Sequence, residues 1–296
     1  MDIGFIGLGN MGAPMVRRLV AAGHNVTGYD VMESAMASLS DVKMNISNDI
    51  LTAASEQEVV ISMLPNGEAL IRVVESILPV MSEGACFIDC STVDISTTRR
   101  VAKLLKDAAI HALDAPVSGG VGGAVAGTLT FMVGGSEASF AIGNPLFKLM
   151  GQRVIHCGID GAGQAAKICN NMILGVTMIA TSEAFALADD LALDRQKLFD
   201  VVSTSSGNSW SMSTYCPAPG IGPKSPSDNN YLPGFSASLM LKDLTLSQEA
   251  AAIHRTPTKT GQLALEIYQE FVESGKGGTL DFSAILQDLA SRVKDK

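Results

Sequence analysis

Short apolar runs alternate with longer amphipathic segments along the first half of the chain. The apolar runs span residues 3–7, 25–30, 59–63, 86–89 and 111–113, and later runs span 129–133 and 154–157. Segments such as Met11–Ala22 and Thr97–Ala108 lie between them and carry apolar residues at helical spacing. Strands that alternate with helices indicate βαβ units, so this half predicts an α/β domain with a doubly wound parallel sheet.

The pattern changes after about residue 161, where the apolar runs of strand length stop. A long helix is expected from Gly163 to about Leu191, and further helices are expected at 195–204, 238–253, 258–273 and 282–290. The stretch Cys216–Gly234 is rich in Pro, Gly, Ser and Asn and predicts a loop. We therefore expect two domains, the α/β domain at residues 1–162 and an all-α domain at residues 163–296.

Composition narrows the function classes. The net charge is −9 and aromatic residues make up 5% of the chain, so it lacks the positive footprint and stacking platforms of nucleic-acid-binding proteins. No unbroken apolar run reaches about 20 residues, and we expect no membrane span. The five cysteines form no CxxC pair, which favours a reducing, cytoplasmic location, and the four histidines show no metal-ligand spacing, so no metal is expected.

A glycine-rich turn joins the first predicted strand to the first predicted helix. It consists of Gly7, Leu8, Gly9, Asn10, Met11 and Gly12. In such a turn the first glycine permits the tight bend, the second lets a pyrophosphate approach, and the third lets the helix pack against the strand. The helix N-terminus offers N–H groups and partial positive charge to phosphates. This combination predicts a dinucleotide site.

Asp30 ends the second predicted strand, near the position where an acidic residue binds the ribose hydroxyls of a dinucleotide. A carboxylate there repels a 2′-phosphate, and Val31, Met32 and Glu33 supply no arginine to attract one. We therefore predict NAD rather than NADP as the cofactor. Capping of the next helix is an alternative role for Asp30.

Two loops after the following strands should border the cofactor, because ligands of such sheets bind outside the carboxyl ends of the strands. One loop contains Leu64 and Pro65, and the other contains Ser91 and Thr92. Ser91 and Thr92 could equally be helix caps.

A third segment combines a hydroxyl group with exposed backbone amides, at Ser118, Gly119 and Gly120. Oriented amides of this kind suit a carboxylate ligand. A flexible glycine turn is the alternative interpretation, because Gly122 and Gly123 follow.

Lys167 and Asn171 are four residues apart on the long predicted helix and therefore share a face. Burial disfavours the charged form of a lysine, which makes a buried amine a usable general base. Asn171 could bind a substrate hydroxyl or hold the lysine. Lys167 could instead extend to the surface from the helix end. Lys242 is a second lysine in an apolar setting, and the spacing assigns no role to Asp243 beside it.

Six motifs occur in the order found in the β-hydroxyacid dehydrogenase family, which the whole chain resembles. They are GFIGLGNMGAPM at 4–15, SMLPNG at 62–67, DCST at 89–92, DAPVSGGVGGAVAGTL at 114–129, GAGQAAKICNNM at 161–172 and LMLKDL at 239–244. The resemblance implies a Rossmann-type NAD-binding domain followed by a helical domain for substrate binding and oligomerisation, in a homodimer or homotetramer. Relatives that use NADPH tend to carry Asn-Arg where this chain has Tyr29-Asp30.

The resemblance also implies site roles. Lys167 is expected to be the catalytic lysine, with Asn171 beside it. The substrate is expected to contact Ser118, Gly119, Gly120, Asn170, Asn171, Trp210 and Lys242, although a structural role for Trp210 is equally open. The nicotinamide side of the cofactor is expected to contact Leu64, Pro65, Thr92 and Lys242.

The implied activity is NAD-dependent oxidation of the primary alcohol of a small β-hydroxyacid. The first candidate substrate is 3-hydroxyisobutyrate, an intermediate of valine catabolism, and the alternatives are tartronate semialdehyde, serine and 4-hydroxybutyrate. A protein that binds NAD(H) without turnover is a hypothesis of a different class. The joint presence of Lys167, Asn171 and the Ser118–Gly120 segment favours an enzyme.

Overall fold

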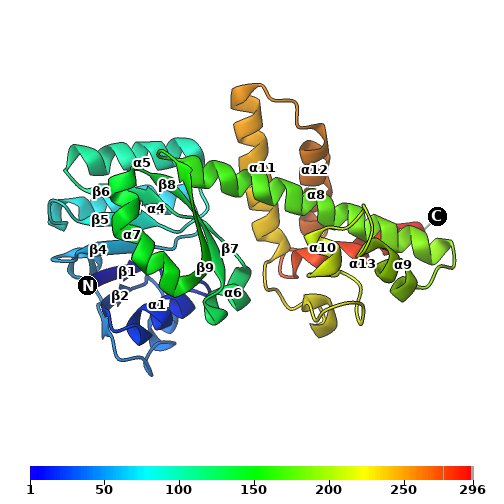
Figure 1. The fold of residues 1–296 in the computed structure, drawn as a ribbon, viewed down its shortest axis with the longest axis horizontal. Coiled ribbons are helices and arrows are strands. Elements are labelled where there is room, and N and C mark those ends of the chain that lie inside the picture. Colours follow the sequence, from blue (N-terminus) through cyan, green and yellow to red (C-terminus); the bar gives the residue numbers. More distant parts are fainter. Residues whose placement is uncertain (276, 295–296) are drawn as a thin grey trace. The chain divides into compact units, whose positions relative to one another are not determined.

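The computed structural model describes residues 1–275 and 277–294 (Figure 1). Positions 276, 295 and 296, which fall within the predicted second domain, lie outside the described residues. Contacts between Cα atoms divide the chain into a first unit, Met1–Lys167, and a second unit, Ile168–Lys296. Each unit is described by itself below.

The first unit is built on a nine-stranded sheet. Its strands are β1 (Asp2–Ile6), β2 (Asn25–Tyr29), β3 (Asn45–Ile46), β4 (Val59–Ser62), β5 (Cys86–Asp89), β6 (His111–Asp114), β7 (Val117–Ser118), β8 (Leu129–Gly135) and β9 (Gly151–Gly158). The order is β3-β2-β1-β4-β5-β6-β8-β7, with β9 paired to β8. Pairing is parallel except where β8 meets β6 and β7. The predicted doubly wound, mostly parallel sheet is confirmed.

Helices cover both faces of this sheet because neighbouring strand residues point to opposite sides. On β4, Ile61 packs in a cluster with Met15 of α1, whereas Val60 packs in another with Leu70 of α4. The helices of this unit are α1 (Gly12–Ala21), α2 (Glu33–Ala37), α3 (Ile50–Ala54), α4 (Gly67–Ile77), α5 (Ile95–Asp107), α6 (Gly120–Ala126) and α7 (Glu137–Met150). Cover on both faces explains why the central strands β4 and β5 are buried along their whole length.

The second unit is helical. It contains most of α8 (Ala162–Asp190) together with α9 (Arg195–Val202), α10 (Trp210–Ser213), α11 (Ala237–His254), α12 (Lys259–Glu273) and α13 (Ile285–Lys294). Its core joins Met178 of α8 to Met240, Tyr268 and Phe282. The expected loop at 216–234 contains one short 3-10 turn, Pro226–Asn229. The predicted all-α second half is confirmed.

Helix α8 is, among the described helices, the one that is long and apolar enough to cross a membrane by length and composition. Core helices of water-soluble proteins meet the same test, and 44% of the most apolar window is buried within the protein. Thr177, Thr181 and Glu183 interrupt the apolar run of this helix, and the expectation of no membrane span stays a prediction.

Candidate active site

The glycine-rich turn lies between β1 and α1, and its three glycines differ in what surrounds them. Gly7 adopts a positive φ of 97°, and a Cβ there would lie 2.2 Å from the carbonyl oxygen of Met63. A Cβ on Gly12 would lie 1.9 Å from the carbonyl oxygen of Gly7. A Cβ on Gly9 would meet no atom within 4 Å. The turn and the close packing thus require Gly7 and Gly12, whereas Gly9 leaves open space.

The first turn of α1 is suited to an anion. Its N-cap residue, Met11, supplies no side-chain hydrogen bond, and the first turn contains no acidic residue. Ala13 N–H already donates to the carbonyl oxygen of Gly9 at 3.0 Å, and Pro14 has no N–H. The backbone N–H groups of the glycine-rich turn and the positive end of the helix dipole are therefore what suits a phosphate here. The residues present therefore fit a dinucleotide, whose pyrophosphate would lie beside Gly9 and the N-terminus of α1.

Asp30 follows the carboxyl end of β2 and is bonded to this turn. Its Oδ2 accepts a hydrogen bond of 2.7 Å from the backbone N–H of Leu8, and its Oδ1 accepts one of 2.8 Å from Met32. The N-cap of α2 is Met32, so Asp30 does not cap that helix. Val31 and Met32 are exposed and carry no charge, so neither offers a positive partner to a 2′-phosphate.

The two loops expected beside the nicotinamide are joined by one serine. The hydroxyl of Ser91 accepts a hydrogen bond of 2.8 Å from the N–H of Leu64 and donates one of 2.5 Å to Asp89. The N-cap of α5 is Asp94, so Ser91 and Thr92 do not cap that helix. Ser91 therefore holds the Leu64–Pro65 loop against the end of β5.

Ser118, Gly119 and Gly120 form the junction between β7 and α6. Ser118 is the last residue of β7, which pairs with β8, and Gly120 is the first residue of α6. Gly119 and Gly120 have φ values of 131° and 60°, which favour glycine. The segment is a strand-to-helix junction whose two glycines adopt a left-handed backbone conformation.

Lys167 is buried, with 6% of its surface exposed. Its Nζ donates a hydrogen bond of 2.9 Å to the carbonyl oxygen of Val117, the residue before Ser118. The alternative in which Lys167 extends to the surface is wrong. Within the first unit, the amine thus lies beside the segment expected to bind the substrate carboxylate.

Asn171 is buried one turn further along α8, in the second unit. Its Nδ2 donates a hydrogen bond of 2.5 Å to Oδ2 of Asp243, and its Oδ1 accepts one of 2.9 Å from Asn170. Nζ of Lys242 lies 3.4 Å from Oδ1 of Asp243. Asp243, only 2% exposed, therefore orients Asn171. Sequence reasoning missed this role because the two residues are far apart in the chain.

Trp210 is the first residue of α10 and is 48% exposed. Its ring stacks on Tyr215 at a centroid distance of 4.8 Å, and Tyr215 stacks on Phe282 of the core. One face of Trp210 therefore has a structural contact, and the exposed part is available to a ligand. Both roles considered from the sequence remain compatible with this geometry.

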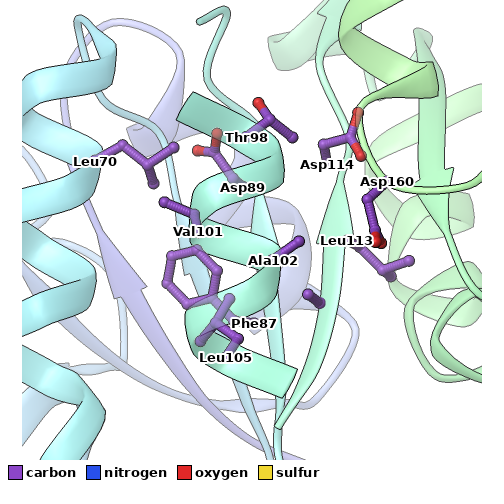
Figure 2. Close-up of a pocket in the computed structure, with 11 residues that line it drawn as sticks. Leu70, Phe87, Asp89, Thr98, Val101, Ala102, Leu105, Leu113, Asp114 and Asp160 are labelled. Carbon is purple, nitrogen blue, oxygen red and sulfur yellow. The ribbon is translucent and has the colours of Figure 1, made fainter. Parts of the chain in front are cut away.

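Two buried carboxylates end adjacent strands at paired positions, Asp89 on β5 and Asp114 on β6. Figure 2 shows both near α5, with Asp160 beside Asp114. The cavity they line holds about 10 Å³, roughly the space of one water molecule, so it is not the dinucleotide site. Burial, with a smaller effect of the nearby Asp89 charge, raises the pKa of Asp114 to about 6. Each aspartate directly follows an apolar run in the sequence, and this shared position could have identified the pair.

No cluster of three or more His, Cys, Asp or Glu side chains suited to a metal occurs in the part of the chain that the structure describes. The chemistry that the described residues offer is that of the buried amine of Lys167 in the first unit and of the buried amide of Asn171 in the second.

The chain matches two family models that together span most of its length. The model for the NAD binding domain of 6-phosphogluconate dehydrogenase matches residues 2–158, and the model described as NAD-binding of NADP-dependent 3-hydroxyisobutyrate dehydrogenase matches residues 161–289. The 3-hydroxyisobutyrate dehydrogenase of Pseudomonas aeruginosa is 42% identical, over 96% of this chain and 97% of the relative. The chain belongs to the 3-hydroxyisobutyrate dehydrogenase family.

Further members of the 3-hydroxyisobutyrate dehydrogenase family agree with this assignment. The human mitochondrial 3-hydroxyisobutyrate dehydrogenase is 41% identical, over 97% of this chain and 86% of the relative. A solved structure of the Mycobacterium tuberculosis 3-hydroxyisobutyrate dehydrogenase with L-serine is 44% identical, covers 97% of this chain and 98% of that chain, and has a TM-score of 0.93. The chain is accordingly an NAD-dependent hydroxyacid oxidoreductase, as the sequence motifs predict.

Proposed function

We propose that this enzyme oxidises the primary alcohol of 3-hydroxyisobutyrate to methylmalonate semialdehyde, a step of valine catabolism, with Lys167 as general acid and base. The observation that carries the proposal is the hydrogen bond of 2.9 Å from Nζ of Lys167 to the carbonyl oxygen of Val117. This bond holds a buried amine next to Ser118, the start of the segment proposed to bind the substrate carboxylate.

The first unit supplies the proton transfer and the anion contacts. The hydroxyl of Ser118 and the N–H groups of Gly119 and Gly120 hold the carboxylate of the substrate, which fixes the hydroxyl-bearing carbon. Neutral Lys167 takes the proton of that hydroxyl at Nζ and returns it in the reverse reaction. When bound, NAD supplies the hydride acceptor.

The cofactor contacts proposed for the first unit follow from its geometry. The turn residues Gly7 to Gly12 bind the pyrophosphate, and Asp30 binds the ribose. Leu64, Pro65 and Thr92 line the nicotinamide side, on loops that Ser91 joins.

For the second unit we propose substrate roles for Asn171, Asn170, Trp210 and Lys242, with Lys242 also contacting the cofactor. Support comes from Asp243, which orients the amide of Asn171 and lies 3.4 Å from Nζ of Lys242. The hydrogen bond to the buried carboxylate of Asp243 fixes the direction of the Asn171 amide. An amide held in this way can recognise a substrate hydroxyl in one orientation.

Assembly and location are part of the proposal. Apolar residues of the second unit are exposed on three helices, Ile173 and Leu187 on α8, Ile253 on α11 and Leu263 on α12. This supports a homodimer or homotetramer built through that unit. The net charge of −9 argues against a nucleic-acid partner or an anionic membrane surface, and the free cysteines fit a cytoplasmic location. Light scattering of the purified protein measures the assembly, and a monomer at micromolar concentration contradicts it.

Serine is the second candidate substrate, because the Mycobacterium tuberculosis relative was solved with L-serine. The deciding experiment compares kcat/KM for NAD reduction with (S)-3-hydroxyisobutyrate, L-serine, 4-hydroxybutyrate and glycerate, the alcohol form of tartronate semialdehyde. We expect 3-hydroxyisobutyrate to exceed each of the others at least tenfold. A higher kcat/KM for any other acid contradicts the substrate assignment while leaving the reaction class intact.

A further inference from the structure

The carboxylate of Asp114, at the end of β6, is bonded to the start of α8. Its Oδ1 accepts a hydrogen bond of 2.8 Å from the N–H of Gly161, and its Oδ2 accepts one of 2.9 Å from the N–H of Gln164. These N–H groups belong to the helix start, where partners within the helix are lacking and the helix dipole attracts negative charge. A side chain from the sheet therefore sets where α8 begins.

Two glycines leave the space that this carboxylate fills. A Cβ on Gly134 of β8 would lie 2.4 Å from Oδ1 of Asp114, and a Cβ on Gly163 would lie 2.8 Å from its Oδ2. Asp114 itself is buried. The carboxylate therefore fits closely against the backbone at Gly134 and Gly163, where a larger residue would clash with it. This close fit restricts the movement of the carboxylate and of the helix start that is bonded to it.

The same turn of α8 is bonded to the loop that follows β5. Nε2 of Gln164 donates a hydrogen bond of 2.8 Å to the carbonyl oxygen of Ser91, and its Oε1 accepts one of 3.2 Å from the N–H of Val93. Thr92, proposed on the nicotinamide side, lies between those two residues. Asp114 therefore fixes the first turn of α8, and Gln164 in that turn fixes the loop after β5.

Lys167 follows Gln164 by three residues, about one helical turn. Its amine is bonded to Val117, which follows Asp114 by three residues. We propose that Asp114 is a positioning residue, which fixes the first turn of α8 and thereby places Nζ of Lys167 at the carbonyl of Val117. The role of Lys167 as the base rests on the proposed function, but its placement by Asp114 does not.

The charges around Asp114 come from several elements. Burial and the charge of Asp89 on β5 both raise the pKa of Asp114. The charge of Asp114 in turn contributes to the raised pKa of Cys157 on β9. Asp160, in the turn before α8, lines the same cavity and is paired at 2.5 Å with Lys106 of α5. The side chain of Arg99, also on α5, lies beside Gly161. Because the pKa of Asp114 is raised to about 6, the test is made at pH 8, where the carboxylate is ionised and accepts both hydrogen bonds.

The test compares Asp114→Asn with a matched control, Asp49→Asn. Asp49 also accepts hydrogen bonds from two backbone N–H groups at a helix start, but its helix, α3, carries no proposed site residue. Each protein is assayed for kcat, KM and NADH dissociation constant. In addition, acetylation of Lys167 by acetic anhydride is measured by mass spectrometry relative to the exposed Lys103, a readout independent of activity.

For Asp114→Asn we expect kcat to fall by about 10²-fold with KM changed less than threefold, because a displaced base loses rate rather than affinity. Acetylation of Lys167 relative to Lys103 should rise at least threefold, and NADH dissociation should stay within twofold. Asp49→Asn should change none of these values. If Asp114→Asn does not fold, Asp114→Glu keeps the charge but adds a methylene against Gly134 and Gly163, and we expect the same two changes.

Wild-type acetylation of Lys167 in the folded Asp114 variant overturns the proposal, and so does an equal effect of Asp49→Asn. If the wild-type enzyme oxidises no hydroxyacid, the proposed function fails. The acetylation ratio then still decides whether Asp114 places Lys167.

Discussion

Replacement of Asp114 by Asn should change how the stability of the first unit depends on pH. The side chain is 4% exposed, and its pKa is raised from 3.8 to about 6, mainly by burial. Asn has nearly the same shape but does not titrate. It also loses one acceptor for the two N–H groups of α8, which costs about 1–3 kcal/mol at every pH. The pH-dependent part of the difference therefore isolates the carboxylate.

The magnitude follows from the shift of about two pKa units, each equivalent to about 1.4 kcal/mol. Because the folded state holds the proton more tightly than the unfolded state, the protonated carboxyl favours folding below pH 3.8. This advantage disappears as the pH rises through about 6. Between pH 4 and pH 7, the wild type should lose about 2.4 kcal/mol of unfolding free energy relative to Asp114→Asn.

Native-state hydrogen exchange of peptides from β1, β4 and β5 measures this difference. Tryptophan fluorescence does not serve, because the single tryptophan, Trp210, lies in the second unit. Intrinsic exchange rates are corrected at each pH, and both proteins are compared in the same buffers. A difference in unfolding free energy that is constant from pH 4 to pH 7, or that grows in favour of the wild type, would refute the reasoning.

Three further substitutions test the site. Asp30→Ala removes the acceptor of the Leu8 N–H and the proposed ribose contact. The KM for NAD should therefore rise about tenfold, and the preference for NAD over NADP should fall. Parallel kinetics with both cofactors measure these two changes. Gly9→Ala meets no atom within 4 Å, so its melting temperature should match the wild type while NADH binding weakens at least tenfold by titration; equal binding contradicts the cradle. Asp243→Ala removes the acceptor of the Asn171 amide, and kcat/KM should fall about tenfold with NADH dissociation within twofold; unchanged kcat/KM contradicts an orienting role.

Most of the sheet was predictable because its longer strands contain short apolar runs and amphipathic helices alternate with them. The seven longer strands follow from this pattern, whereas β3 and β7 have two residues each and carry no periodic signal. The antiparallel pairing of β8 with β6 and β7 was also not predictable from the sequence. It depends on which strands become neighbours in the folded sheet, which no local pattern specifies.

For the site, too, local features were predictable from the sequence and long-range contacts were not. The glycines of the nucleotide turn and Lys167 belong to local motifs, and short-range patterns identify such residues. The partner of Lys167 is Val117 and the partner of Asn171 is Asp243, at separations of 50 and 72 residues. Contacts of this kind are set by tertiary packing, so a single sequence did not predict them.

Single-turnover hydride transfer in a Lys167→Met variant tests the central claim most directly. Methionine keeps the length and apolar stem of lysine but has no amine to accept a proton. NAD-saturated enzyme is mixed with (S)-3-hydroxyisobutyrate at pH 8, and NADH formation is followed by stopped flow, with NADH dissociation measured separately. We predict that the rate falls by more than about 10²-fold, with NADH dissociation within threefold of wild type. A rate within threefold of wild type would contradict Lys167 as the general base.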